Sequence, residues 1–157
     1  MKRRKFLIAL GVMPPLVLEA CKGDQLPKTA TIIEAKVLDD KGNSIENIPL
    51  KFYGFRSYGG NFAGGGGKIE DTFKIEKSSD KQGSVEFTQI VPEITTNAYL
   101  SIGGGAYFPY EKYKIQAKKN ATIINDNDGP AIGVYPDSGG SLVLGEINKY
   151  EIMLTKI

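Results

Sequence analysis

Histidine and tryptophan are absent from this chain of 157 residues, and cysteine occurs once, at Cys21. Histidine is the commonest general base and a frequent metal ligand, so its absence excludes the usual nucleophilic triads and most zinc and non-haem iron sites. A single cysteine cannot form a disulfide within the chain. The lack of tryptophan weakens the case for a sugar-stacking site. We therefore expect no catalytic residues and no cofactor.

A long hydrophobic run is also missing. The apolar stretch at residues 6–18 has 13 residues, and a helix of that length reaches about 20 Å against a hydrocarbon core of about 30 Å. Pro14 and Pro15 would also break such a helix in its middle. The stretch follows basic residues 2–5 and precedes the small residue Ala20, which is the three-part organisation of an export signal. We predict a signal peptide over residues 1–20, with a buried N-terminal helix as the alternative.

The residues before the cysteine carry a family resemblance. Leu18, Glu19 and Ala20, followed by Cys21, resemble the lipobox of bacterial lipoproteins, although Glu19 departs from the small or apolar residue usual at its position. In that family a signal peptidase recognises these residues and cuts before a cysteine that has received a diacylglyceryl thioether. The resemblance implies that Cys21 is lipidated and that the chain is exported and anchored to the bacterial cell envelope, where we expect the outer membrane.

The basic part of the leader bears on the export route. Arg3 and Arg4, followed by Lys5, Phe6 and Leu7, are similar to the core of a twin-arginine export signal. That route carries folded proteins, often with a cofactor already loaded. Ordinary secretory leaders also contain such pairs by chance, so both routes stay open.

Positive charge is concentrated in the leader. Removing residues 1–20 takes away four basic residues and one acidic residue, which leaves 16 basic and 17 acidic residues and a net charge of −1. Lys118-Lys119 is then the only adjacent basic pair. Binding to nucleic acid requires clustered Lys and Arg to neutralise phosphates. We exclude nucleic acid as a partner and expect the membrane, through the lipid on Cys21, and an envelope protein instead.

The remaining chain has the patterns of an all-β domain. Residues 21–29 are polar, contain a proline and show no periodicity, which predicts a lipidated tether before a domain at residues 30–157. Alternating apolar and polar residues with turn signals between them predict about seven or eight strands and little helix, arranged as a β-sandwich. The expected strands are residues 31–38, 50–55, 72–77, 84–90, 98–102, 110–117, 131–135 and 150–155.

Two features of the connections can also be predicted. Residues 80–83 form a turn signal between two cleanly alternating segments, 72–77 and 84–90, so we predict a hairpin there. The Gly-rich segments 58–68 and 103–105 interrupt the alternation and should be long loops.

A second resemblance concerns the fold. Residues 36–50 look like the opening of carboxypeptidase-regulatory-like, or transthyretin-like, domains, in which a strand leads through an Asp-x-x-Gly turn to a second strand that starts near a proline. Residues 79–87 are similar to their second Asp-x-x-Gly turn, and residues 148–154 to their closing strand. The resemblance implies an Ig-like sandwich. Its physical content is turn chemistry, in which the Asp side chain accepts backbone hydrogen bonds and the Gly adopts a positive φ. Exported intradiol dioxygenases also use this fold, but their iron site needs two histidines, so this chain cannot be an active member.

Two short motifs suggest ligands but do not fit them well. A phosphate-binding loop ending at Lys68 would need Gly at position 62 and Ser or Thr at position 69, where the chain has Phe62 and Ile69. Asp126 and Asp128, within the Asn/Asp-rich residues 125–129, supply the oxygen ligands that calcium prefers, but the glutamate of an EF-hand is missing. We keep Asp126 and Asp128 as a weak calcium candidate and favour a simple Asn/Asp turn.

Aromatic residues gather near the predicted loops. If the loops meet at one end of the sandwich, they could form a flat surface for a peptide, a glycan or a protein. Packing in the core or between strands is the competing explanation, and we favour it. The residues proposed for such binding loops are Tyr58, Phe62, Tyr107, Phe108 and Tyr110.

The function that we expect is that of a membrane-anchored, non-catalytic binding or structural module. The alternative is a small envelope hydrolase or ligand carrier that uses carboxylates and the aromatic loops. Nothing in the spacing selects a catalytic carboxylate pair, and solvated strand faces explain the acidic residues more simply. The carboxylates considered are Glu34, Glu70, Asp71, Glu76 and Glu86.

Overall fold

The computed structural model describes residues 28–59, 67–103, 108–127, 129–135 and 141–157. The leader and Cys21 lie outside the described residues, so the predictions made for them stay predictions. The described chain is almost entirely β. Its elements are β1 (Thr31–Asp39), β2 (Pro49–Tyr58), β3 (Lys68–Ser78), β4 (Ser84–Gln89), β5 (Asn97–Ile102), the 3-10 turn η1 (Tyr110–Lys112), β6 (Tyr113–Lys119), β7 (Thr122–Asn127), β8 (Ala131–Tyr135) and β9 (Ile147–Lys156).

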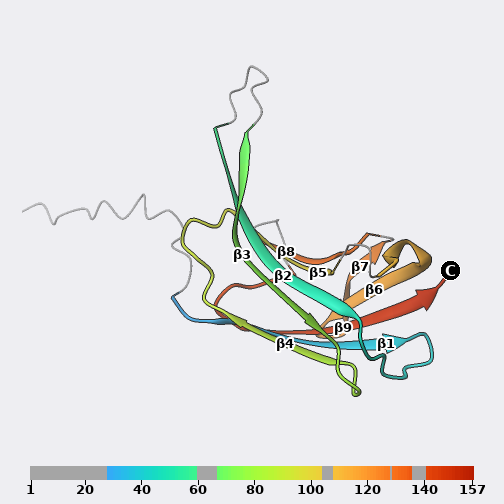
Figure 1. Cartoon of the computed structure of the whole chain (residues 1–157). Helices are drawn as coiled ribbons and strands as arrows, with labels where there is room; N and C mark the ends of the chain where they lie inside the picture. Colours follow the sequence, from blue (N-terminus) through green and yellow to red (C-terminus); the bar gives the residue numbers. More distant parts are fainter. Residues whose placement is uncertain (1–27, 60–66, 104–107, 128, 136–140) are drawn as a thin grey trace, which may run out of the picture.

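The strands form two sheets that pack face to face (Figure 1). The five-stranded sheet has the order β4-β1-β9-β6-β7, and the four-stranded sheet has the order β3-β2-β5-β8. Neighbouring strands are antiparallel, except that β1 and β9 are parallel. The prediction of an all-β sandwich is confirmed, with nine described strands where seven or eight were expected.

The core lies between the sheets because alternate residues of each strand point inward. In β1, Ile33, Ala35 and Val37 are buried while their neighbours are less so. The two sheets meet through aromatic side chains: the ring of Phe52 on β2 lies edge-on to that of Phe87 on β4, with centroids 6.2 Å apart. Both side chains are fully buried, and burying each contributes about 1.5–3 kcal/mol.

The predicted hairpin between residues 72–77 and 84–90 is wrong. β3 pairs with β2 in one sheet and β4 pairs with β1 in the other, so the chain crosses between sheets at residues 79–83. Ser79 is buried at this crossing. Its hydroxyl accepts a hydrogen bond from the Ile48 amide at 2.9 Å and donates one to the Ile45 carbonyl at 2.7 Å. These bonds tie the crossing to the connection between β1 and β2.

Two other segments differ from the expected elements. The strand expected at residues 110–117 begins at Tyr113, because η1 precedes it. The Asn/Asp turn favoured at residues 125–129 is wrong for Asn125, which lies in β7. Its side chain is buried, and its amide donates to the backbone carbonyl of Ala131 on β8. That carbonyl belongs to the other sheet, so the residues around Asn125 in the sequence do not predict this hydrogen bond.

The first Asp-x-x-Gly turn has the predicted chemistry. The Oδ1 atom of Asp39 accepts hydrogen bonds from the amides of Lys41 at 2.9 Å and Asn43 at 2.7 Å. Gly42 adopts a φ of +83°, which residues with a side chain rarely do. Hydrogen bonds from Asn43 and Lys41 lower the pKa of Asp39 below its usual value.

The second turn repeats this geometry. Asp80 Oδ1 accepts hydrogen bonds from the amides of Gln82 and Ser84, both at 2.8 Å, and Gly83 has a φ of +74°. Here the glycine also touches another strand. A Cβ atom at Gly83 would lie 2.4 Å from the carbonyl oxygen of Val37, so the turn packs directly on the end of β1.

Candidate binding surfaces

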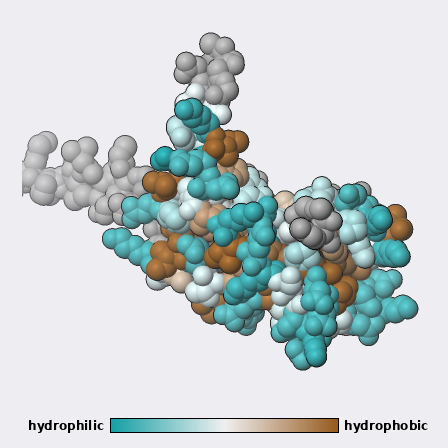
Figure 2. Space-filling view, in the orientation of Figure 1, coloured by the Kyte–Doolittle hydropathy of each residue, from teal (hydrophilic) through white to brown (hydrophobic). Residues whose placement is uncertain are grey.

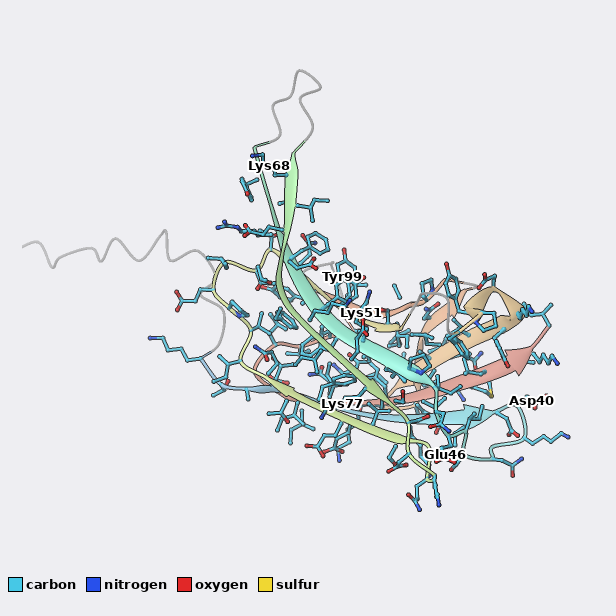
Figure 3. All side chains as sticks on the ribbon, in the orientation of Figure 1. Asp40, Glu46, Lys51, Lys68, Lys77 and Tyr99 are labelled. Carbon is cyan, nitrogen blue, oxygen red and sulfur yellow. The ribbon has the colours of Figure 1, made fainter. Side chains whose placement is uncertain are left out.

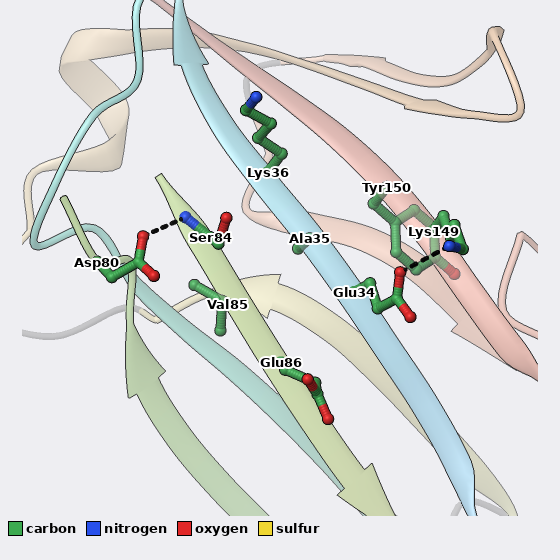
Figure 4. Close-up of a pocket in the computed structure, with 9 residues that line it drawn as sticks. All are labelled: Glu34, Ala35, Lys36, Asp80, Ser84, Val85, Glu86, Lys149 and Tyr150. Carbon is green, nitrogen blue, oxygen red and sulfur yellow. Dashed lines mark hydrogen bonds and ion pairs between the residues drawn. The ribbon is translucent and has the colours of Figure 1, made fainter. Parts of the chain in front are cut away.

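An open groove of about 510 Å³ lies over β4, β1 and β9 on the outer face of the five-stranded sheet (Figure 4). Its charged side chains point outward because they alternate with residues that face the core. The lining residues are Glu34, Ala35, Lys36, Asp80, Ser84, Val85, Glu86, Lys149 and Tyr150.

Strand register brings two of the considered carboxylates together in this groove. Glu34 on β1 lies directly opposite Glu86 on β4, and on its other side opposite Lys149 on β9. Like charges in direct opposition are destabilising. The ammonium group of Lys149 lies 2.9 Å from Glu34 and offsets part of this repulsion. The other carboxylates considered from the sequence, Glu70, Asp71 and Glu76, lie on β3 in the other sheet.

The groove is better suited to binding than to acid–base catalysis. A catalytic acid usually sits in a pocket that removes it from water, which raises its pKa. The side chain of Glu34 is instead 44% exposed and is paired with Lys149. Asp80 is engaged in its own turn. Mixed charges on an open face can make polar contacts with a ligand without excluding water from it.

Three aromatic rings form a column on the outer face of the four-stranded sheet. Tyr53 and Tyr99 are cross-strand partners with stacked rings whose centroids are 5.4 Å apart, and the ring of Phe55 is also stacked with that of Tyr99, at 5.6 Å. The ammonium group of Lys51 lies 4.2 Å from the Tyr53 centroid. Burial, together with nearby Tyr99, raises the pKa of Tyr53. Because the rings cover each other's faces, the column is a poor platform for stacking a sugar.

The residues predicted for aromatic binding loops lie in different environments. Tyr58 ends β2 and is 46% exposed. Phe108 is buried and stacks on Tyr113 with centroids 5.2 Å apart, and Tyr110 is partly buried against the core. Phe62 and Tyr107 lie outside the described residues. Of the three described candidates, Tyr58 therefore presents the most ring surface to solvent.

The ends of β2 and β3 project beyond the rest of the four-stranded sheet (Figure 1). Pairing of β2 with β5 ends at Phe55, whereas pairing with β3 continues through Arg56, Ser57 and Tyr58 to residues 68–70. We call residues 56–58 and 68–70 the arm. A β-bulge at Gly54/Phe55 marks its base. The arm combines exposed aromatic and aliphatic side chains with an ion pair between Arg56 and Glu70, 2.7 Å apart.

The structure adds two observations on ions and membranes. Among the described residues, no three His, Cys, Asp or Glu side chains are grouped to hold a metal ion. Asp128 lies outside the description, as does the side chain of Asp126 in β7. Within the same described ranges, no helix has the length and apolar character needed to span a membrane.

Comparisons with known proteins leave the family open. No protein-family model and no curated protein match the chain. One similar solved structure is a 3-chlorocatechol 1,2-dioxygenase from Rhodococcus opacus 1CP, at 13% identity and a TM-score of 0.42, covering 85% of this chain and 62% of the enzyme. Another is the major pilin protein T3.2 from Streptococcus pyogenes, at 11% identity and a TM-score of 0.35, covering 83% and 45%. The chain thus spans less than two thirds of either protein, and likenesses this distant carry no functional argument.

Proposed function

We propose that the chain is a lipoprotein of the bacterial cell envelope, anchored through Cys21, whose Ig-like or transthyretin-like sandwich acts as a non-catalytic binding or structural module. The sequence supports the anchor through the three-part leader and the residues that precede Cys21. The observation that supports a non-catalytic role is the closed construction of the sandwich.

Side-chain hydrogen bonds connect the two sheets on both sides of the sandwich. On one side, the ammonium group of Lys77 on β3 donates to the backbone carbonyl of Glu86 on β4 at 2.7 Å. On the other side, Asn125 on β7 donates to Ala131 on β8. Fully buried apolar side chains from both sheets occupy the space between. Such a body offers its outer faces and ends for binding, and its packed interior does not suit a ligand carrier.

The alternative function is a small envelope hydrolase, and one observation favours it. Glu34 and Glu86 lie side by side in the same groove, as two acting carboxylates would. The exposure of Glu34 and its ion pair with Lys149 favour the binding module instead.

The anchor is tested by replacing Cys21 with alanine. The variant should leave the membrane fraction, because it lacks the thiol that receives the lipid. Mass spectrometry of the N-terminal peptide should find the diacylglyceryl thioether on the wild-type chain and none on the variant. Membrane association that is unchanged in Cys21→Ala would count against the anchor.

The non-catalytic role is tested with the purified full chain and envelope polymers as substrates. We expect no turnover, and we expect affinity capture from native membranes to recover a specific protein partner. Turnover that both Glu34→Gln and Glu86→Gln abolish, while the control Glu76→Gln on the other sheet retains it, would establish the hydrolase instead.

A further inference from the structure

The sandwich has two distinct ends, which strand direction defines. β1 and β9 are parallel and begin at one end, where the antiparallel β4 finishes and toward which the antiparallel β6 runs. The arm belongs to this end as well. β3 runs from the arm to the turn at residues 79–83, which is hydrogen-bonded to the far end of β1 through Val37 and Gly83. We call the end where β1 begins the tether end, because the chain enters the domain there.

Exposed hydrophobic side chains are concentrated at the tether end. Of the eight large hydrophobic residues that are exposed in the described part of the chain, six lie there, while Ile123 lies level with the middle of β9. Ile69 is 69% exposed on the arm, and Ile90, Ile94 and Ile147 are each more than half exposed. Figure 2 shows apolar groups on the projecting arm. The six residues are Tyr58, Ile69, Ile90, Ile94, Val143 and Ile147.

The opposite end is polar. It carries the two aspartate turns, in which residues 40–43 and residues 80–82 are exposed and contain charged or amide side chains. Figure 3 places Asp40 and Glu46 at this end and Lys68 at the other. Ile157 is the remaining exposed hydrophobic residue, and it lies beyond the last strand at the polar end. Single exposed apolar residues are ordinary on protein surfaces, but their segregation to one end marks an interaction surface.

We propose that the tether end rests on the lipid surface of the membrane that holds the chain, with its isoleucines in the interfacial region. This proposal depends on the lipid anchor proposed above. Residues 22–27 separate Cys21 from the first described residue, Lys28. At roughly 3.3–3.6 Å per residue, these seven steps keep the start of the domain within about 25 Å of the anchor. An end held so close to a bilayer gains by burying exposed apolar groups in it.

The composition of the tether end favours lipid over a charged partner. Arg56 and Lys68 on the arm accompany Tyr58, a combination suited to the headgroup region. Acidic residues are present as well: Glu70 pairs with Arg56, and Glu146 lies just before Ile147. Contact should therefore depend on apolar burial and only weakly on ionic strength or on the charge of the lipid.

The test uses the full acylated chain reconstituted into vesicles of phosphatidylethanolamine and phosphatidylglycerol. An environment-sensitive fluorophore is attached to the Ile94→Cys or Ile147→Cys variant, since lipidation occupies the thiol of Cys21. The matched control is Ile157→Cys, which changes the same residue type at 76% exposure on the opposite end. We expect blue-shifted emission and several-fold stronger quenching by nitroxide-labelled lipids at positions 94 and 147 than at position 157, in low and high salt.

Three results would overturn the proposal. They distinguish failure of the lipid contact from failure of the lipid anchor on Cys21. Equal, weak quenching at all positions in vesicle-bound, acylated protein would leave the anchor standing and remove the lipid contact. Protection of positions 94 and 147 in native membranes but not in pure lipid would show that a protein covers this end. A chain without a thioether on Cys21 that does not associate with vesicles would remove the anchor and, with it, this proposal.

Discussion

At the scale of single residues, the hydrogen bonds of the two aspartate turns are determined by residues that are close in the sequence. Asp39 and Asp80 each accept two backbone hydrogen bonds, and each turn places a glycine at positive φ. These bonds need no distant residue, so the spacing in the sequence was enough to predict them. The glycines differ in surroundings: Gly83 packs on Val37, whereas a Cβ atom at Gly42 would meet nothing within 4 Å.

The pair of glycines allows a controlled substitution. Gly42→Ala should cost about 1–2 kcal/mol of unfolding free energy, because alanine pays for the left-handed conformation alone. Gly83→Ala should cost at least about 1 kcal/mol more, since its Cβ would also displace the end of β1. Urea unfolding followed by tyrosine fluorescence measures both. Equal decreases in unfolding free energy for the two variants would mean that the close contact with Val37 does not contribute to the cost of the Gly83 substitution.

The lowered pKa of Asp39 predicts that the stability of the fold decreases at acidic pH. Hydrogen bonds from the side chain and backbone of Asn43 lower its pKa in the folded chain. The ionised form therefore stabilises the fold above the unfolded value of about 3.9, and this contribution is lost as pH falls through the lower folded pKa. Asp39→Asn should flatten the fall in the urea midpoint below about pH 4. An ordinary aspartate pKa in an NMR titration of Asp39 would contradict the prediction.

At the scale of elements, the choice of partner was the feature that alternation could not predict. The segments around β3 and β4 have the same inside–outside pattern whether they pair with each other or with different strands. The inward-facing Ser79 and its bonds to residues 45–48 accompany the change of sheet. β4 is consequently an edge strand, and Lys77 covers one of its outward carbonyls.

Removing the hydrogen bond from Lys77 to the Glu86 carbonyl should expose the edge of β4. Lys77→Met keeps most of the aliphatic stem but loses the hydrogen bond to Glu86, so β4 amides should exchange several-fold faster and the protein should self-associate at lower concentration. Stability should fall by less than about 1 kcal/mol, because the lysine is exposed. The control is Lys81→Met, in the neighbouring turn. Amide exchange rates are measured by hydrogen exchange and self-association by sedimentation. Equal exchange rates in β4 and equal self-association of the two variants would contradict the prediction.

At the scale of the whole molecule, one core serves both sheets. Phe52 from the four-stranded sheet packs on Phe87 from the five-stranded sheet, and hydrogen bonds link the sheet edges on both sides. Neither sheet can keep its inner face buried without the other. The surface, in contrast to the shared core, differs between the two ends of the sandwich: one end is polar, and the tether end is apolar.

A shared core predicts cooperative unfolding. The amides of Phe52 on β2 and Ile152 on β9 should exchange through the same global opening, with equal free energies and equal urea dependence. Native-state hydrogen exchange at increasing urea measures both. Opening of the four-stranded sheet at a lower free energy would show that the sheets unfold separately.

The sequence by itself determined the all-β class, most strand positions and the chemistry of the Asp39 and Asp80 turns, because these depend on neighbours within a few residues. Tertiary structure alone decided that β3 and β4 belong to different sheets and that Glu34 lies beside Glu86. It also decided that scattered isoleucines gather at the end where the chain enters. Pairing and register depend on burying both inner faces at once, and that free energy belongs to residues far apart in the chain.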